Sequence, residues 1–547
     1  MNGQRSNNRQ TWSGPGKNIQ KKDPPGTIPE YIEMLEGLAN KTGLIKNASV
    51  RSSLYWLSVK WNPRLARSLF EMLLLHMPEE NDIDEFFEFP GMNDLHGELV
   101  LGGVYGYEVI EFAHLIEKLP LHTLAVGTSG SGKTNLSKIL IEQAYLAGVN
   151  SIKVSDPKAE YADIAKKYPD FLLLNWSDLY FNPFLPPPNV PINEWHQSVI
   201  GHLAQALNFW EAAQSLFLKL LDSFTQQMNN GNSDKEIDEL KIPNVIELLN
   251  RLNQYKPRYK QKDYMVMATV SSRLEMLFNT FRESILTKKS VLPFLIDRHC
   301  IIQTHGLNGE IESWLLEFLL LWEYMYRLYN PDHRELILHI YDECQHRLFS
   351  SEKERNIKKI SSSVISTLVD EARALNIGIC SLSQEPSSLI KAILNNSWMK
   401  IVFHLGSGAE VSVMQESLGL KYEQTEVLHE LETGEAIVRM AGGYMKAFPV
   451  KINEFISPES VNEYEFLEEQ NTMKEELYQE AGLSRIAEEK GFDKHRENKA
   501  SYQESRDGSK EKREGDTQSK KGEGGDTKQQ QDVFQGSEGD GVEYDEL

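Results

Sequence analysis

Short apolar runs alternate with helical patterns along the middle of the chain. Apolar runs of four to eight residues indicate buried strands, and strands separated by helices favour parallel pairing. We therefore predict an α/β fold with a mainly parallel, doubly wound sheet. Residues 99–112, which partly alternate, predict a hairpin leading into it. The apolar runs lie at residues 121–126, 151–155, 171–174, 300–304, 336–341, 378–383, 400–405 and 435–440.

The flanking segments have different patterns. Residues 28–77 carry apolar side chains at helical spacing, for example Ile32, Leu35 and Leu38, and predict a small helical lobe. Residues 183–293 are mostly helical in pattern and too long for a simple crossover, so we expect a helical insertion. Polar, low-complexity composition predicts disorder at both ends. The expected organisation is a leader (1–27), a helical lobe (28–98), the α/β domain (99–457), a helical extension (458–491) and a disordered tail (492–547).

Composition narrows the class of protein. Of the 547 residues, 40% are hydrophobic and 25% are charged, as in soluble globular proteins. A formal charge of −22 argues against a protein that coats nucleic acid over its whole surface. The first residues lack an export pattern, and no apolar run is long enough to span a membrane, so we expect a cytoplasmic protein without a membrane partner. Cys300, Cys344 and Cys380 are interpreted as buried hydrophobic residues.

A glycine-rich segment lies between the first apolar run of the α/β domain and a helical pattern. In this setting, glycines let backbone N–H groups curl around phosphates, a lysine reaches the β- and γ-phosphates, and a hydroxyl binds Mg²⁺. We predict binding of ATP and Mg²⁺, with Lys133 on phosphate and Thr134 on the metal. The alternative is a glycine turn before a core helix. The predicted binding residues are Gly127, Thr128, Ser129, Gly130, Ser131, Gly132, Lys133, Thr134 and Asn135.

Polar residues end two later apolar runs. Asp342 and Glu343 follow the run at 336–341, which places Asp342 as a magnesium ligand and Glu343 as the base that activates water. A strand that merely exits into a polar turn is the alternative. Gln384 ends the next run, where a side chain can lie between the phosphate loop and the acidic pair. It would sense the γ-phosphate, or it would cap a helix beginning near Pro386.

Taken together, these motifs resemble the HerA–FtsK superfamily of hexameric DNA-pumping ATPases, and specifically its HerA branch. The resemblance spans roughly residues 100–452. Its further carriers are Asp156 to Tyr161 after the second apolar run, the acidic pair within Tyr341 to His346, and the segment from Glu371 to Pro386. The residues departing from the usual pattern are Ala159, where a glycine is usual, and Glu385, where a basic residue is common.

The resemblance implies a RecA-like fold and a ring of six subunits, with ATP between neighbours and double-stranded DNA in the centre. It implies that Lys133, Asp342, Glu343 and Gln384 act within one subunit and that Arg373 reaches the neighbour's nucleotide. Pairing of Arg373 with Asp370 or Glu371 on a helix surface is the alternative. The N-terminal β-barrel usual in HerA proteins, the winged helix of FtsK proteins and the membrane helices of type IV coupling proteins are not evident.

Two basic clusters interrupt this acidic sequence. Rings of this type present loops to the pore, so these clusters are candidate DNA contacts, with solvated helix faces as the alternative. The candidate DNA-binding residues are Arg258, Lys260, Lys262, Lys353, Arg355, Lys358 and Lys359.

The sequence thus predicts an ATP-hydrolysing ring motor that translocates double-stranded DNA and feeds a separate nuclease or other effector, in DNA processing or antiviral defence. Two other functions remain open: an assembly scaffold that recruits an effector enzyme, and a soluble motor for conjugation or packaging.

Overall fold

One large sheet organises the part of the chain that the structure describes. The computed structural model describes residues 28–41, 44–46, 48–75, 86–90, 95, 97–206, 211–225, 241–254, 262–344, 348–349, 364–442, 444–458 and 461–483. These all belong to the first of two units of the chain, residues 1–483, and the second unit, 484–547, lies outside them. The sheet has eleven strands in the order β2-β1-β11-β10-β9-β3-β8-β7-β4-β6-β5.

The strands closely follow the predicted apolar runs. They are β1 (Leu99–Val104), β2 (Tyr107–His114), β3 (Thr123–Val126), β4 (Ser151–Asp156), β5 (Leu172–Asn175), β6 (Cys300–Gln303), β7 (Ile337–Tyr341), β8 (Ile377–Ser383), β9 (Met399–Val402), β10 (Glu435–Met440) and β11 (Phe448–Ile452). The seven strands from β9 to β5 run parallel, whereas β10, β11, β1 and β2 add antiparallel. The α/β fold with a mainly parallel sheet is therefore confirmed. β11 was not predicted, because Pro449 interrupts a short run and proline is unusual inside a strand.

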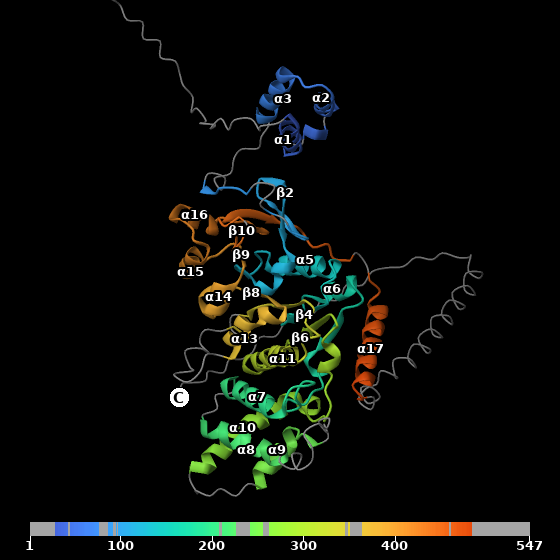
Figure 1. Cartoon of the computed structure of the whole chain (residues 1–547), viewed down its shortest axis with the longest axis vertical. Helices are drawn as coiled ribbons and strands as arrows, with labels where there is room; N and C mark the ends of the chain where they lie inside the picture. The colour runs from blue at the N-terminus through green and yellow to red at the C-terminus, as the bar shows by residue number, and fades with distance from the viewer. Residues whose placement is uncertain are drawn as a thin grey trace, which may run out of the picture. The chain divides into compact units, whose positions relative to one another are not determined.

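Each face of the sheet has its own helical cover. Alternate strand residues such as Ile152 and Leu338 share a core with α5 (Lys133–Leu146) and α6 (Ala162–Lys167). The intervening residues face α11 (Gly309–Tyr329), which contacts α13 (Val364–Ala372). α11 is buried along most of its length, because the sheet covers one side of it and α7 and α13 cover other sides. Figure 1 shows α11 between the sheet and α7.

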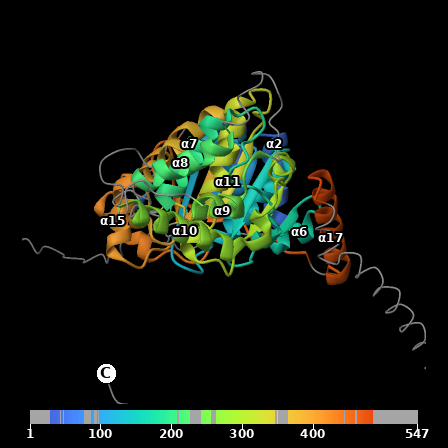
Figure 2. The ribbon, with the colours of Figure 1, turned by 90° about the horizontal axis from the view of Figure 1, so that it is seen from below.

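The connection between the neighbouring strands β5 and β6 is helical, as predicted for residues 183–293. It contains α7 (Ile192–Ala206), α8 (Glu211–Thr225), α9 (Val245–Gln254) and α10 (Lys262–Phe281). α7 packs on α11, and α8 packs on α7, α9 and α10 (Figures 1 and 2). Short helices complete the α/β part: α14 (Lys391–Asn396), α15 (Gly408–Leu418), α16 (Tyr422–Glu426), η2 (Ile116–Leu121), η3 (Trp176–Asp178), η5 (Arg282–Ile285), η6 (Leu292–Leu295), η8 (Arg373–Leu375), η9 (Pro386–Ser388) and η10 (Val427–His429).

A helix covers the sheet edge at β5. In α17 (Glu463–Glu480), the buried Gln470 accepts a hydrogen bond from the Leu173 N–H at 2.7 Å and donates to the Phe171 carbonyl at 3.0 Å. These bonds satisfy backbone groups of an edge strand that would otherwise be open to pairing with another chain. This helix lies within the predicted extension at 458–491.

The N-terminal helices have a core of their own. They are α1 (Ile28–Lys41), η1 (Leu44–Lys46), α2 (Ala48–Val59) and α3 (Pro63–Leu75). Leu35, Leu54 and Leu69 belong to a cluster separate from the core of the sheet. The predicted disordered segments, 1–27 and 492–547, lie outside the described residues. No helix in the described ranges combines the length and apolarity needed to cross a bilayer.

Candidate nucleotide site

The glycine-rich loop between β3 and α5 has a backbone that only glycine tolerates. Gly130 and Gly132 have φ angles of 78° and 117°. A Cβ atom on Gly127 would lie 2.6 Å from the Ser131 Oγ. α5 begins at Lys133, and no described side chain caps its first turn. The N–H groups at this helix start are therefore oriented for an anion.

Neighbouring strands hold the loop in place. The Gly127 N–H donates to the Ser383 carbonyl at the end of β8 at 3.1 Å, and the Thr128 N–H donates to the His404 carbonyl at 2.9 Å. From the other side, the Gly434 N–H donates to the Ser131 carbonyl at 3.0 Å. The loop is therefore formed without a ligand, at the carboxyl edge of the sheet, where α/β folds bind ligands.

Lys133 is a buried cation whose recorded partners are backbone carbonyls. Its Nζ donates to the carbonyls of Gly127 and Thr128, both at 2.8 Å. Burial lowers the pKa of Lys133 to about 8, while the nearby carboxylates of Asp342 and Glu343 act in the opposite direction. A phosphate oxygen would give this ammonium a full counter-charge, so the loop and its lysine fit a nucleoside triphosphate.

The acidic pair lies at the end of β7, at the same edge of the sheet. Asp342 is buried and accepts a hydrogen bond from the Tyr161 hydroxyl at 3.2 Å. That hydroxyl also contacts the Ser137 Oγ of α5 at 2.7 Å, so Asp342 is linked to the helix that follows the glycine loop. Burial raises the pKa of Asp342, and the hydrogen bond from Tyr161 opposes this shift. A divalent cation beside Asp342 would favour its ionised form.

Gln384 and Glu343 are in direct contact. Because β8 lies between β3 and β7, Gln384 follows β8 at the point between the glycine loop and the acidic pair. Its Nε2 donates to Glu343 Oε1 at 2.7 Å. The short helix η9 begins at Pro386 with Glu385 at its N-cap and no capping bond from a described side chain. The geometry thus favours the position predicted for a sensor over the alternative of a helix cap.

Lys158 joins this cluster, and the sequence analysis did not single it out. Its Nζ forms an ion pair with Glu343 Oε1, the oxygen that Gln384 also contacts. The hydrogen bond to Glu343 raises the pKa of Lys158. The spacing of 185 residues between Lys158 and Glu343 gave no local signal, and only the pairing of β4 with β7 brings them together.

The segment after β4 supplies another acid. Buried Asp156 accepts the N–H groups of Glu160 at 2.9 Å and Tyr161 at 3.1 Å, which fixes a tight turn. Ala159 in this turn has a φ of 57°, a left-handed conformation that explains why glycine is usual there. Glu160 Oε2 accepts a hydrogen bond from the Thr134 Oγ1 at 3.2 Å. Glu160, Thr134 and Asp342 thus offer the oxygen ligands that Mg²⁺ prefers when phosphates complete its shell.

Asn135, predicted to bind nucleotide, uses its side chain elsewhere. Its amide donates to the Asn453 carbonyl at 2.7 Å and accepts from the Phe455 N–H at 2.8 Å. The side chain therefore fastens the segment after β11 to α5. Only the backbone of Asn135 remains for phosphate.

Arg373 lies at the amino ends of the parallel strands, whereas the glycine loop lies at their carboxyl ends. It begins η8, directly before β8, and it is exposed. The seven residues of β8 span about 20 Å, which separates Arg373 from the site of its own subunit. The alternative partners of Arg373 are engaged elsewhere. Asp370 accepts a hydrogen bond from the Asn396 amide at 2.7 Å, and Glu371 accepts one from the Tyr324 hydroxyl. Arg373 makes no recorded side-chain bond within the described part of the chain.

Of the candidate DNA contacts, only Lys262 belongs to a described element. Lys262 begins α10, but its side chain is not described. The others, Arg258, Lys260, Lys353, Arg355, Lys358 and Lys359, lie outside the described residues.

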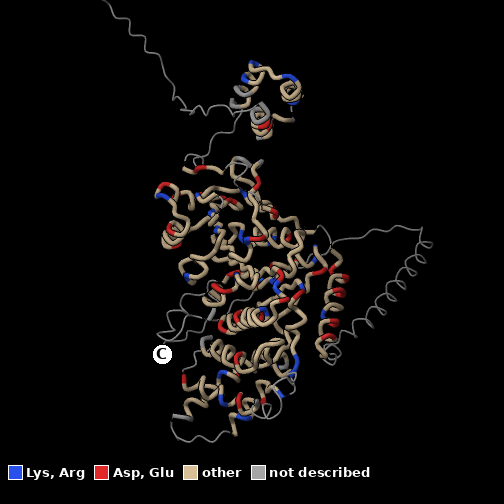
Figure 3. Tube along the Cα trace, in the orientation of Figure 1, with Lys and Arg blue, Asp and Glu red and all other residues tan. Residues whose placement is uncertain are grey.

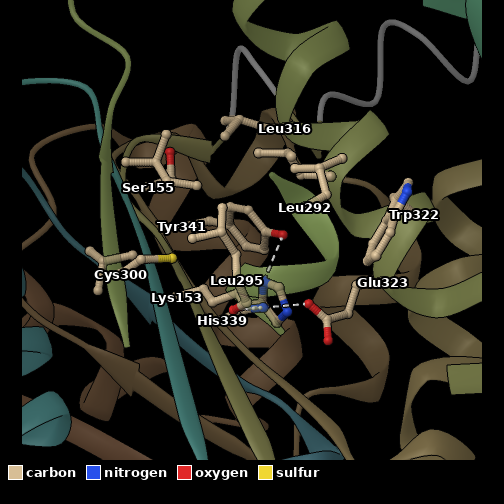
Figure 4. A pocket seen from close by; sticks show the side chains of 13 residues that line it. Lys153, Ser155, Leu292, Leu295, Cys300, Leu316, Trp322, Glu323, His339 and Tyr341 are labelled. Atoms are coloured by element: carbon tan, nitrogen blue, oxygen red, sulfur yellow. Dashed lines mark hydrogen bonds and ion pairs between the residues drawn. The ribbon is translucent and has the colours of Figure 1, made fainter. Parts of the chain in front are cut away.

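A separate cavity lies under α11 and is not the nucleotide site. Figure 4 shows Lys153 and His339 of the strands beside Glu323 of α11, with Ser155 and Tyr341 lining the same cavity. Its volume of about 50 Å³ is far below the several hundred Å³ of ordinary ligand pockets. Its strand residues alternate with those that face α5, so it opens on the other face of the sheet.

The comparisons with known proteins agree with this geometry. Residues 101–313 match the family model described as "Helicase HerA, central domain". VirB4 of Thermoanaerobacter pseudethanolicus is 15% identical, with a TM-score of 0.53, over 66% of this chain and 97% of that chain. The plasmid coupling protein TrwB in complex with ADP and Mg²⁺ is 13% identical, with a TM-score of 0.49, over 68% of this chain and 96% of that one. No curated protein matches the sequence.

The matched segment contains the glycine loop, Asp156 and Glu160. Residues 101–313 are therefore similar to the central domain of HerA helicases, and the chain shares an α/β fold with VirB4.

Proposed function

We propose that this protein hydrolyses ATP with Mg²⁺ and uses the energy to translocate double-stranded DNA as a ring of subunits. The observation that carries the proposal is the contact of Gln384 and Lys158 with Glu343, beside Asp342 and opposite the glycine loop. Under this proposal, the base Glu343, the magnesium ligand Asp342 and the phosphate-binding Lys133 lie at one edge of the sheet. The match to a helicase HerA domain supports DNA as the substrate.

Each residue has a role that its position supports. Lys133 would exchange its two carbonyl partners for phosphate oxygens and neutralise their charge. Thr134, Asp342 and Glu160 would hold Mg²⁺, which neutralises charge on the phosphates when bound. Glu343 would accept a proton from the attacking water, and Gln384, already bonded to it, would report whether the γ-phosphate is present.

Glu343 is held by Lys158 in the ligand-free arrangement. The carboxylate is 18% exposed and its lysine partner is 41% exposed, so the pair is accessible to solvent. Exposed ion pairs of this kind contribute at most about 1 kcal/mol and are readily exchanged. ATP binding would then free Glu343 for the water without a large cost.

Arg373 supports the assembly part of the proposal. An exposed arginine about 20 Å from its own site is placed to serve a neighbouring subunit. A trans arginine stabilises charge that develops on the transferred phosphoryl group, and this effect is typically 10³- to 10⁵-fold in rate. We infer a hexamer from the family resemblance, in which hydrolysis requires the ring.

We further infer a cytoplasmic motor that works with a separate nuclease or other effector, in DNA processing or antiviral defence. The three cysteines are free and buried, which suits a reducing compartment. The family resemblance of the sequence is the support for an effector. Native mass measurement with an ATP analogue, with and without duplex DNA, tests the ring: a hexamer is expected, and a monomer under all conditions would contradict it.

The activity is tested by measuring ATP hydrolysis with and without duplex DNA. Wild-type protein is expected to hydrolyse ATP faster when DNA is present, and Lys133→Ala is expected to abolish hydrolysis. Lys138→Ala is the matched control, since Lys138 lies one turn later on α5 and pairs with Asp163 at 3.3 Å, away from the glycine loop. Hydrolysis by a verified hexamer that DNA leaves unchanged would overturn the motor proposal.

A further inference from the structure

The N-terminal helices carry positive charge in an acidic protein. Residues 37–70 contain six Lys or Arg residues and no Asp or Glu, although the whole chain has a formal charge of −22. The acidic residues of α1, Glu30, Glu33 and Glu36, precede this stretch, and Glu71 of α3 directly follows it. Charge asymmetry of this kind is typical of a surface that meets a polyanion.

The positive side chains lie on the solvent side of α2 and α3. Arg51 of α2 and Lys60, which directly follows α2, are exposed, as are Arg64 and Arg67 of α3. The apolar positions of the same helices, such as Leu54 and Leu69, are buried in the lobe's own core. Figure 3 shows the basic residues on α2 and α3 and the acidic residues on α1.

Two aromatic rings lie among these cations. Tyr55 is 63% exposed and Trp56 is 57% exposed, and their rings meet edge to face with centroids 5.8 Å apart. Tyr55 follows Arg51 by four residues and therefore lies beside it on α2, and Trp56 precedes Lys60 by four residues of sequence. Large exposed aromatics of this kind mark a contact surface.

A three-residue connection joins the two helices. The Asn62 side chain accepts the N–H groups of Arg64 at 3.1 Å and Leu65 at 3.2 Å, which fixes the start of α3 immediately after Lys60 and Trp61. Helix, short connection and helix is the order found in modules that place a helix against duplex DNA. The connection thus carries Lys60, and α3 presents Arg64 in its first turn.

We propose that the exposed face of α2 and α3 is a second DNA-binding site, which holds duplex DNA through its phosphates without reading sequence. The basic face is defined by Arg51, Lys60, Arg64 and Arg67, with Tyr55 and Trp56 between them. Arginine and lysine neutralise backbone phosphates, and the rings cover the apolar parts of the sugars. This proposal rests on the proposed action on DNA but not on the nucleotide site, since it assigns a separate surface with its own chemistry.

The experiment measures binding of a fluorescent 30-base-pair duplex to the full-length protein without nucleotide, over a series of salt concentrations. The variant Lys60→Gln/Arg64→Gln/Arg67→Gln removes three charges of the basic face. We expect binding to weaken by about 10- to 100-fold, and the slope of log affinity against log salt to become shallower by about 2 to 3, because each phosphate contact contributes about 0.9 to that slope. Two unrelated duplex sequences should give the same result.

The control variant Lys219→Gln/Lys391→Gln/Lys421→Gln removes the same charge from exposed positions outside the lobe. It should bind the duplex like wild type, and both variants should keep the wild-type unfolding temperature and DNA-independent ATP hydrolysis. Equal weakening by both variants would mean that only net charge matters, and would overturn the proposal.

The remaining outcomes separate this proposal from the proposed function. If wild type binds the duplex and the basic-face variant binds it equally well, the lobe proposal fails while the motor proposal stands. If that variant instead loses an acidic protein partner or its own assembly, the face binds protein and the proposal is wrong. If wild type shows no duplex binding at any salt concentration, both proposals fail.

Discussion

Two lysines five residues apart, Lys153 and Lys158, each form an ion pair with a glutamate, but one pair is buried and the other is open to solvent. Lys153 and Glu323 are only 11% and 4% exposed, and their Nζ to Oε2 distance is 2.6 Å. Lys153 also donates to the carbonyls of Leu295 and Ile296, and Glu323 also pairs with Arg327. Lys158 follows Lys153 by five residues and lies just after β4. It pairs with Glu343, and these two side chains are more exposed, at 41% and 18%.

The difference separates a structural pair from the pair to which we assign a function. The ion pair joins β4 to α11, and both side chains have further buried partners, so the pair has little freedom to exchange partners. Glu343 shares one oxygen between Lys158 and Gln384, beside the glycine loop, and solvent reaches it. A carboxylate that must accept a proton from water needs the second environment.

Breaking the buried pair should give the largest loss of stability. Glu323→Ala leaves Lys153 and Arg327 buried without their counter-charge, which typically costs about 3–5 kcal/mol. The free energy of unfolding, measured by urea denaturation, should fall by that amount. Lys158→Ala is the matched control and should cost less than about 1 kcal/mol. Equal losses of stability in the two variants would contradict the difference between the buried and the exposed pair.

Acid should weaken the buried region through His339, which lies beside Glu323 (Figure 4). Burial lowers the pKa of His339 to about 3, although Glu323 acts in the opposite direction and Lys153 and Arg327 reinforce the shift. Below pH 6.5 the unfolded chain binds a proton that the folded chain does not, so stability falls as the pH drops from 6.5 toward 3. The loss from this group is about 2 kcal/mol at pH 5.

The variant His339→Gln should remove this part of the pH dependence, as seen in unfolding curves recorded between pH 7 and 5. His305→Gln is the control, because His305 is exposed. An unchanged pH dependence in His339→Gln would show that this histidine is not buried in its neutral form.

Local sequence patterns predicted the candidate site residues that belong to short, continuous motifs. The glycine loop, the acidic pair and Gln384 were singled out from apolar runs and the polar residues that end them, whereas the strand order that places β8 between β3 and β7 comes from the structure. Lys158 was missed because its partner is distant in sequence and only strand pairing joins them. The side-chain role of Asn135 was missed because Asn453 and Phe455 belong to a segment after β11, a strand that Pro449 concealed.

The smallest expected effect concerns the turn that carries Lys158. Ala159 has a φ of 57°, and a left-handed conformation costs a residue with a side chain roughly 1 kcal/mol or more. Ala159→Gly should therefore raise the free energy of unfolding by up to about 1 kcal/mol, measured by urea denaturation. Ala162→Gly, at the first position of α6, has no left-handed backbone to relieve and should not raise it. A loss of stability in Ala159→Gly would contradict the strained turn.

The central claim is that Glu343 acts within its own subunit and Arg373 acts on the next one. Glu343→Gln and Arg373→Ala should each lower ATP hydrolysis by about 10²-fold or more. The decisive measurement is the ATPase rate of the two inactive variants mixed in equal amounts and reassembled. About a quarter of the sites in a random ring then combine an intact Glu343 with a neighbour's intact Arg373, so the account predicts recovery of about a quarter of wild-type activity. A mixture as inactive as its components would contradict the shared site.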